Sequence, residues 1–218
     1  MAGWSALGAI AARTERVRLV PMVLNGLHYE PGVLAKESSV LSHISRDRFE
    51  FGVGAGDWRE SFEAWGERFP PWEERLGRLE ELVAALRSLW RGQPVTVAGD
   101  HVRLDGAICA PPPSRPPRVV VGVGGSRRAL ERAADFADEV NVYDTPGLIE
   151  EALDLARLSP RPLTVSVFAD WSWDEWPQDA LAAVGAWSDR GIERCFVSVA
   201  GPDTLDRIRT LAAFTEGA

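Results

Sequence analysis

The spacing of apolar residues along the chain changes repeatedly, and each change separates a predicted strand from a predicted helix. Continuous β-branched and apolar runs predict buried strands, at 17–24, 48–53, 118–123, 139–143, 163–169 and 193–199. Apolar residues at steps of three and four predict helices, over 7–13, 31–44, 72–90, 126–137, 146–158, 177–190 and 202–214. Consecutive strands joined by helices run parallel, so the pattern predicts an α/β fold, either an open doubly wound sheet or a (β/α) barrel.

Local signals refine two of these segments and add a hairpin. Pro31 opens the helix over 31–44, where we expect one apolar face, made of Val33, Leu34, Val40, Leu41 and Ile44. The helix over 72–90 follows a loop rich in Trp, Gly and Pro at 57–71 and ends before Gly92. Alternation over 94–104 predicts a hairpin that turns at Gly99-Asp100. No linker interrupts the alternation, so we expect one domain over 1–218.

Composition narrows the classes of function. A hydrophobic content of 45% supports a sizeable core, and a net charge of −8 disfavours nucleic acid and anionic membranes as partners. No run of about 18 apolar residues is present, so we expect no membrane span. The two cysteines, Cys109 and Cys195, lie far apart and suit a reducing, cytoplasmic location. Of the nine tryptophans, four near predicted loops either line an apolar substrate pocket or pack as core, namely Trp58, Trp65, Trp171 and Trp173.

The ends of the predicted strands carry the candidate chemistry, because parallel α/β folds place their sites at the carboxyl ends of the strands. One strand ends in Gly52-Val53-Gly54-Ala55-Gly56-Asp57, which is not GxGxxG since Asp57 replaces the third glycine. The glycines would let a flat ligand approach the backbone, and Asp57 would be an acid or base at the mouth of the site. A tight turn with a solvated Asp57 is the alternative.

A second glycine run lies between a predicted strand and helix, at Gly124-Gly125-Ser126. Its backbone N–H groups, a Ser126 helix cap and the following Arg127 and Arg128 favour a phosphate, although an ordinary glycine turn is the alternative. The three histidines lack partners at ligand spacing, so we expect no metal site. Of these, His28 follows the polar end of the first strand, where a structural role is the commoner one.

Taken together, several motifs resemble the bacterial luciferase-like superfamily of flavin- and coenzyme F420-dependent oxidoreductases. The matching segments lie between residues 5 and 143, at 14–19, 29–41, 45–56, 69–71, 74–75, 79–81, 89–92, 121–125 and 137–138. The resemblance implies a (β/α)8 TIM-barrel type of fold with FMN or F420 across the barrel mouth. It also implies hydride transfer or monooxygenation of a small organic substrate.

The resemblance also assigns site residues. It implies a non-prolyl cis peptide beneath the cofactor ring at Met22-Val23, with Asn25 as a polar neighbour. It places Gly54, Ala55 and Gly56 against the cofactor and makes Asp57 the candidate proton donor. The cofactor phosphate would be held by a separate loop, made of Val123, Gly124, Gly125, Ser126 and Arg127.

The chain departs from the family pattern in three places. Arg46-Asp47-Arg48 replaces a usual Gly-Gly-Arg, and Asp138-Glu139 replaces a usual Asp-Gly. The family's first strand, first helix and second strand have no counterpart, which leaves about six of eight βα units. Three interpretations follow: an active oxidoreductase, a non-catalytic flavin-binding relative that dimerises through exposed edges at 17–24 and 193–199, or a chain whose true start lies upstream of Met1.

Overall fold

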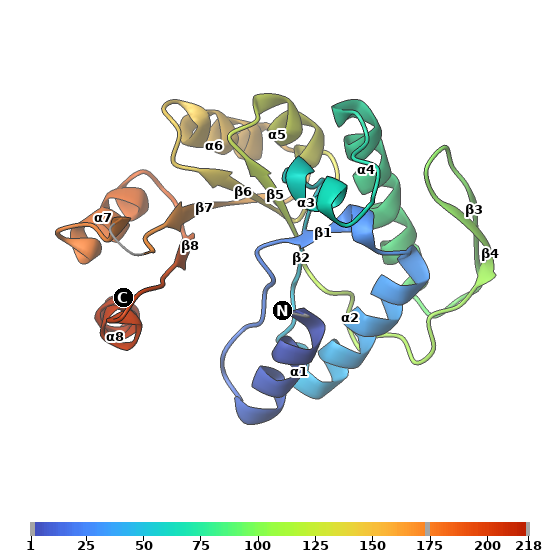
Figure 1. Cartoon of the computed structure of the whole chain (residues 1–218), viewed down its shortest axis with the longest axis horizontal. Coiled ribbons are helices and arrows are strands. Elements are labelled where there is room, and N and C mark those ends of the chain that lie inside the picture. Colours follow the sequence, from blue (N-terminus) through green and yellow to red (C-terminus); the bar gives the residue numbers. More distant parts are fainter. Residues whose placement is uncertain (1–2, 173–174, 217–218) are drawn as a thin grey trace. The chain divides into compact units, whose positions relative to one another are not determined.

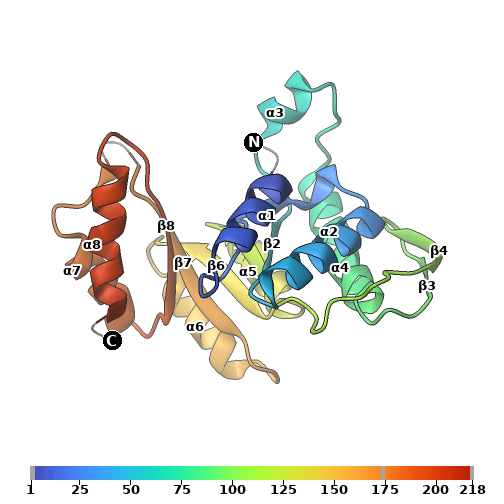
Figure 2. The same ribbon diagram turned by 90° about the horizontal axis from the view of Figure 1, so that it is seen from below.

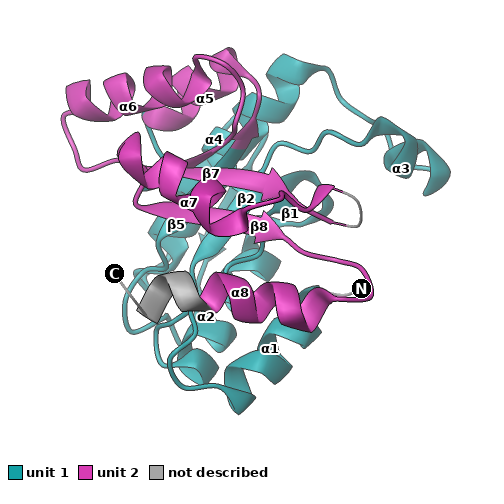
Figure 3. Cartoon of the chain, turned by 90° about the vertical axis from the view of Figure 1, so that its left-hand side faces the viewer, with its two compact units in different colours: residues 1–122, 135–138 teal, residues 123–134, 139–218 magenta. Residues whose placement is uncertain are grey.

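The computed structural model describes residues 3–172 and 175–216. The chain divides into two compact units, one formed by residues 1–122 and 135–138 and the other by 123–134 and 139–218 (Figure 3). Each unit combines parallel strands with helices. Whether the two behave as one domain, as the uninterrupted alternation predicts, stays a prediction.

The first unit holds three parallel strands in the order β1-β2-β5 and an antiparallel hairpin of β3 and β4 (Figure 1). Its elements are α1 (Gly3–Arg13), β1 (Leu24–Asn25), the 3-10 helix η1 (Gly26–His28), α2 (Pro31–Ser45), β2 (Phe51–Gly54), α3 (Arg59–Ala64), α4 (Trp72–Leu89), β3 (Val95–Ala98), β4 (Arg103–Ala107) and most of β5 (Val119–Gly124). The strand register places Asn25 opposite Gly54 and Gly54 opposite Gly122.

The second unit holds three parallel strands in the order β6-β7-β8 (Figure 2). Its elements are α5 (Arg127–Ala134), β6 (Glu139–Tyr143), α6 (Leu148–Leu158), β7 (Thr164–Asp170), α7 (Ala180–Asp189), β8 (Arg194–Ser198) and α8 (Thr204–Glu216). Six parallel strands alternating with helices confirm the incomplete (β/α) TIM-barrel type of fold, since a complete barrel has eight such units.

The core of the first unit forms where β2 meets α4. Phe51 and Val53 are fully buried, and the Phe51 ring meets the edge of Trp90 with centroids 5.7 Å apart. Trp90 is buried too, and its Nε1 donates to the Ser38 hydroxyl on α2 at 2.8 Å. Because a buried indole N–H needs an acceptor, this bond lets Trp90 fill the space between α4 and α2.

The strand expected over 17–24 is largely irregular. Leu19 forms one isolated bridge with Phe49, and β1 covers only Leu24–Asn25. Pro21 has no N–H to offer a neighbouring strand, so the ladder cannot run through it. The prediction of a continuous strand there was wrong in extent.

The apolar face expected on α2 was also wrong. Leu34 and Leu41 are buried as expected, but Val33, Val40 and Ile44 are 50%, 52% and 46% exposed. The buried side of α2 consists of small and polar residues besides the leucines, namely Ala35, Ser38, Ser39, Ser42 and Ser45. Their hydroxyls find acceptors, as Ser38 and Ser42 do on the preceding turn of α2.

Three side chains of α2 bind three successive carbonyls of the proline-rich run. The Lys36 ammonium donates to Ala110 O at 2.8 Å, and the Ser39 hydroxyl donates to Pro111 O at 2.6 Å. The His43 Nε2 lies 2.9 Å from Pro112 O and donates there, since a carbonyl only accepts. Prolines offer acceptors without N–H donors, so a helix face that carries donors matches this run.

Candidate functional site

The carboxyl ends of β1, β2 and β5 bring together several of the predicted site residues. The Met22–Val23 peptide is cis, as the family resemblance implied. The Val23 side chain, 41% exposed, lies against two glycines in paired register, Gly54 and Gly122. A Cβ added to either glycine would lie 2.9 Å from a methyl of Val23, so both positions require glycine for this contact. The result is an exposed apolar surface laid over glycine backbone.

Two further glycines of the same run accommodate the segment before and within β1. A Cβ on Gly52 would lie 1.9 Å from the Pro21 carbonyl oxygen. Gly56 has φ +75°, and a Cβ there would lie 2.8 Å from Asn25 Oδ1. That oxygen accepts the Leu27 N–H at 3.0 Å and thereby begins η1. The glycine run is therefore shaped by close packing against residues 21–25 and not by a turn alone.

Asp57 follows these glycines with an exposed side chain, and a buried cation holds the backbone before it. The Arg75 guanidinium, 8% exposed, donates to the carbonyls of Gly56 and, at 3.4 Å, of Ala55. It is stacked by Phe69 at 4.2 Å and Trp72 at 4.6 Å. Burial lowers the pKa of Arg75, while the Asp57 carboxylate acts in the opposite direction.

Arg75 was not among the predicted site residues, although two features of the sequence indicate a buried, partnered arginine. The Glu74-Arg75 pair belongs to the segments that resemble the family. Arg75 also precedes Leu79, Leu82 and Leu86 at steps of four, three and four, which places it on the buried face of α4. A charged residue on a buried helical face calls for a partner, and here the partners are carbonyls and aromatic rings.

The segment at 57–71, predicted as a loop, contains the short helix α3 and is anchored by His28. The His28 Nδ1 lies 2.8 Å from Glu67 Oε2, and its ring stacks on the buried Phe62 ring at 4.5 Å. Trp65 lies 5.4 Å from the same histidine ring but is 66% exposed, and Trp58 is 68% exposed. These contacts fit the structural role that was the commoner expectation for His28, while two tryptophans face solvent close to Asp57 in sequence.

In the second unit, the predicted phosphate loop joins β5 to α5. Ser126 caps α5 as predicted, with its hydroxyl accepting the Ala129 N–H at 3.2 Å. Gly124 has φ +58° and lies against the Tyr143 ring. The Arg127 guanidinium forms an ion pair with Glu151 on α6, so its charge is directed toward that helix. The loop therefore offers backbone N–H groups and a cap, with Arg127 already engaged.

The second unit contains further tryptophans, including Trp171, predicted either to line a substrate pocket or to pack as core. Trp171 is 8% exposed and packs between Trp176 and Trp187, with ring centroids 5.8 and 5.4 Å away, so it belongs to the core. Trp173 lies outside the described residues. Within residues 3–172 and 175–216, no three His, Cys, Asp or Glu side chains gather as metal ligands would. In the same ranges, no helix combines the length and apolarity that a membrane crossing requires.

The family of the chain follows from comparison with known proteins. The family model described as luciferase-like monooxygenase matches residues 1–212. The chain belongs to this family. Among curated relatives, the chain is 36% identical over 142 residues to an F420-dependent glucose-6-phosphate dehydrogenase of Nakamurella multipartita, covering 59% of this chain and 39% of that protein. It is 30% identical over 130 residues to an FMNH(2)-dependent dimethylsulfone monooxygenase of Pseudomonas fluorescens, covering 60% and 35%.

Solved structures of this luciferase-like chain's relatives agree with the fold. An F420-dependent secondary alcohol dehydrogenase, solved with an F420-acetone adduct, superposes with a TM-score of 0.74 at 17% identity, over 92% of this chain and 79% of that one. Monooxygenase RslO1 from Streptomyces bottropensis gives a TM-score of 0.66 at 26% identity, over 99% and 63%. The chain spans 47% and 39% of the length of the relatives from Mycobacterium bovis and Nakamurella multipartita that it matches.

Proposed function

We propose that this luciferase-like protein is an oxidoreductase that uses F420 or FMN for hydride transfer to, or monooxygenation of, a small organic substrate. The observation that carries the proposal is the exposed Val23 side chain, which lies on Gly54 and Gly122 beside the cis Met22–Val23 peptide. The glycines carry no side chain that would block a ligand, and the exposed Val23 side chain offers an apolar contact. Together they suit the face of a flat tricyclic ring. The relatives named for F420 and for FMNH(2) support both cofactors.

In this proposal each residue of the first unit has a binding or positioning task. Met22 and Val23 support the ring, and Asn25, Ala55 and Gly56 border it. A bound F420 or FMN would supply the redox chemistry, and the protein supplies orientation and electrostatics. Asp57 would hold or deliver a proton at its carboxyl group, on backbone that Arg75 fixes through the Gly56 carbonyl.

The glycine loop of the second unit is proposed to bind the cofactor phosphate. The N–H groups of Gly124 and Gly125 and the Ser126-capped start of α5 are suitable donors for an anion. Arg127 would contribute its charge only after leaving Glu151. We therefore expect backbone donors to dominate this contact. Replacing FMN by riboflavin, which lacks the phosphate, should weaken binding several-fold, while Arg127→Gln should change it little.

Titration with FMN and F420, separately, tests the cofactor assignment through quenching of tryptophan fluorescence. We expect saturable binding of at least one of them. Gly122→Ala should weaken it about tenfold or more, because the new methyl displaces Val23. Gly8→Ala is the matched control, since a Cβ there has nothing within 4 Å. Binding of neither cofactor would contradict the proposal.

Asp57→Asn tests the proton-transfer role. The substitution keeps the shape of the side chain and removes its acid–base function, so we expect cofactor affinity within about twofold of the parent and turnover reduced about 10²-fold or more. Turnover would be followed with the bound cofactor and a panel of secondary alcohols, glucose 6-phosphate and dimethylsulfone, the compounds named for relatives. Unchanged turnover would remove Asp57 from the mechanism.

The second candidate function is a non-catalytic flavin-binding protein that dimerises through strand edges. Among the described strands, β1 pairs only with β2 and β8 only with β7, so each leaves an unpaired edge in its own unit. Light scattering coupled to size exclusion would give the dimer mass, and binding of FMN without turnover would favour this candidate.

A cytoplasmic location is proposed on the basis of the two free cysteines, Cys109 and Cys195, which suit a reducing compartment.

A further inference from the structure

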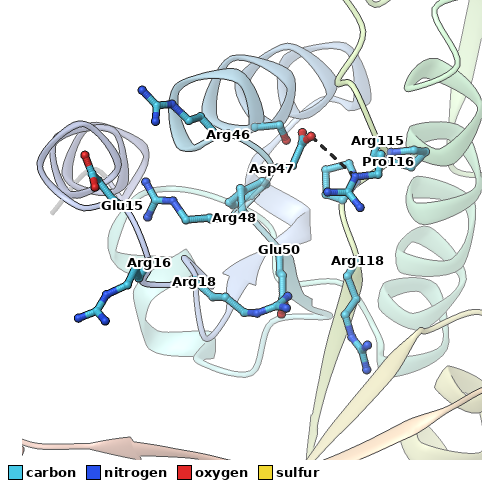
Figure 4. Close-up of a pocket in the computed structure, with 13 residues that line it drawn as sticks. Glu15, Arg16, Arg18, Arg46, Asp47, Arg48, Glu50, Arg115, Pro116 and Arg118 are labelled. Atoms are coloured by element: carbon cyan, nitrogen blue, oxygen red, sulfur yellow. Dashed lines mark hydrogen bonds and ion pairs between the residues drawn. The ribbon is translucent and has the colours of Figure 1, made fainter. Parts of the chain in front are cut away.

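The amino ends of β2 and β5 border a cavity in the first unit, at the opposite ends of these strands from Gly54 and Gly122. Three chain segments line most of it: residues 15–18 after α1, residues 46–50 after α2, and residues 115–118 before β5 (Figure 4). Its volume is about 570 Å³, enough for a small molecule. None of the residues assigned to the cofactor lines it.

The charge of this cavity is opposite to that of the chain. Six arginines and three carboxylates line it, in a chain whose net charge is −8. Each of the three segments contributes two of the arginines, and the view in Figure 4 shows their side chains fanning out from separate segments. The cavity therefore concentrates positive charge on a protein that is otherwise acidic.

The carboxylates compensate only part of this charge. Glu50 pairs with Arg18 at 2.6 Å, and Asp47 lies 3.8 Å from Arg115. The Arg48 guanidinium donates to the carbonyls of Ala11, Thr14, Val17 and Ser45 and to the Thr14 hydroxyl. These acceptors are neutral, so the bonds fix Arg48 in place without cancelling its charge. Arg16 and Arg46 are exposed at the rim.

Backbone conformation marks the same wall of the cavity. Arg46 and Asp47 have φ +55° and +61°, in the left-handed region that side chains with a Cβ disfavour. This chain keeps two charged residues where glycine would be less strained, and both line the cavity. This left-handed turn ends α2, where the Asp47 N–H donates to Ser42 O at 2.9 Å, and it places both residues on the wall of the cavity.

We infer that this cavity binds a small polyvalent anion that carries phosphate or carboxylate groups. Guanidinium groups bind both oxyanions through paired N–H donors, and arginines on three segments can engage more than one anionic group at once. The ligand would occupy a second site, separate from that of the cofactor. The inference does not rest on the proposed oxidoreductase activity.

Isothermal titration at low ionic strength, with pyrophosphate and citrate as separate probes, tests the inference. We expect saturable binding of one anion per chain, weakened at least tenfold by 0.5 M NaCl because salt screens exposed charges. The variant Arg16→Gln/Arg46→Gln should bind at least tenfold more weakly. Arg91→Gln/Arg103→Gln removes the same charge from exposed positions outside the cavity and should bind as the parent does.

A second variant separates binding from folding. Arg46→Gly/Asp47→Gly relieves the left-handed strain, so its unfolding midpoint should rise while anion affinity falls at least tenfold. Preference for pyrophosphate would identify the natural ligand as a phosphate compound, and preference for citrate as a carboxylate; either supports the inference. No saturable binding, or equal affinity in the Arg16→Gln/Arg46→Gln variant and its control, would overturn it. A failure to bind FMN or F420, with anion binding retained, would contradict the proposed function but not this inference.

Discussion

Close backbone packing at single glycines sets the geometry of the candidate site. Gly52→Ala would place a methyl 1.9 Å from the Pro21 carbonyl oxygen, and backbone must move to relieve the clash. We expect a loss of about 1–3 kcal/mol in the free energy of unfolding, the usual range for overpacking. Urea denaturation measures it. Gly8→Ala in α1 has open space and should instead gain about 0.5–1 kcal/mol. Equal effects of the two changes would contradict the packing argument.

Arg75 should stabilise the backbone at Gly56 through its hydrogen bonds to carbonyl oxygens. Arg75→Met keeps the apolar stack with Phe69 and Trp72 but leaves the Gly56 carbonyl without its donor, which costs about 1–3 kcal/mol. Arg75→Lys should recover little, because one ammonium cannot reproduce the planar stack and the bonds to residues 55, 56 and 70 together. Limited proteolysis within 57–71 should accelerate in both variants. A lysine variant as resistant as the parent would refute this.

At the residue level, the sequence predicts a candidate site but not the residues that pack against it. The glycine run and Asp57 can be predicted from the sequence, since they end a predicted strand. The residues that contact those glycines cannot, because Pro21, Val23 and Asn25 reach them through tertiary packing of an irregular segment. For Arg75, the sequence shows only that a charged residue lies on the apolar face of a predicted helix. Its carbonyl acceptors, at Ala55 and Gly56, lie about twenty positions away in sequence.

At the scale of elements, one carboxylate attaches the β3–β4 hairpin to α4. Glu81 accepts the N–H groups of Asp100, His101 and Val102 at 3.1, 2.9 and 2.8 Å. Burial opposes ionisation of Glu81, but these three donors outweigh it and hold its pKa below the usual range. The ionised carboxylate therefore stabilises the folded state above the pKa of the unfolded chain, and the gain disappears as the pH falls through the lower folded value.

Glu81→Gln tests this attachment. The amide oxygen still accepts but carries no charge, so we expect a loss of about 1 kcal/mol at pH 7. The difference from the parent should be smaller at about pH 3, because the stabilisation by the ionised carboxylate is lost as the pH falls from the unfolded value of about 4.3 through the lower pKa of the folded state. Urea denaturation at both pH values, with hydrogen exchange at residues 100–102, measures it. Glu37→Gln, exposed on α2, is the control and should be about as stable as the parent at pH 7.

Helices and strands with a clear hydrophobic periodicity were predicted correctly, whereas those whose packing depends on contacts with other elements were not. The periodicity of α4 and the continuous runs of β5 and β6 match the structure within one or two residues. The face of α2 was misassigned because serines with internal hydrogen bonds replace the expected valines against the core. Hydrophobicity alone cannot anticipate a polar side chain that finds its acceptor on its own helix.

At the scale of the whole molecule, the uninterrupted alternation predicts one cooperative domain, although the chain forms two compact units. The polypeptide passes from one unit to the other within β5, between Gly122 and Val123, so neither unit is a single continuous segment. We therefore expect a single calorimetric transition whose enthalpy equals its van't Hoff enthalpy. Two resolved transitions would show that the units unfold independently.

The contact between α2 and the proline-rich run has a practical consequence. Lys36, which binds the Ala110 carbonyl, is the sole lysine of the 218-residue sequence. An amine-reactive dye would therefore have one side chain to modify besides the terminal amine. Acylation there would neutralise the charge and weaken the bond to Ala110, so a fluorophore at Lys36 would report directly on whether α2 and the prolines stay together.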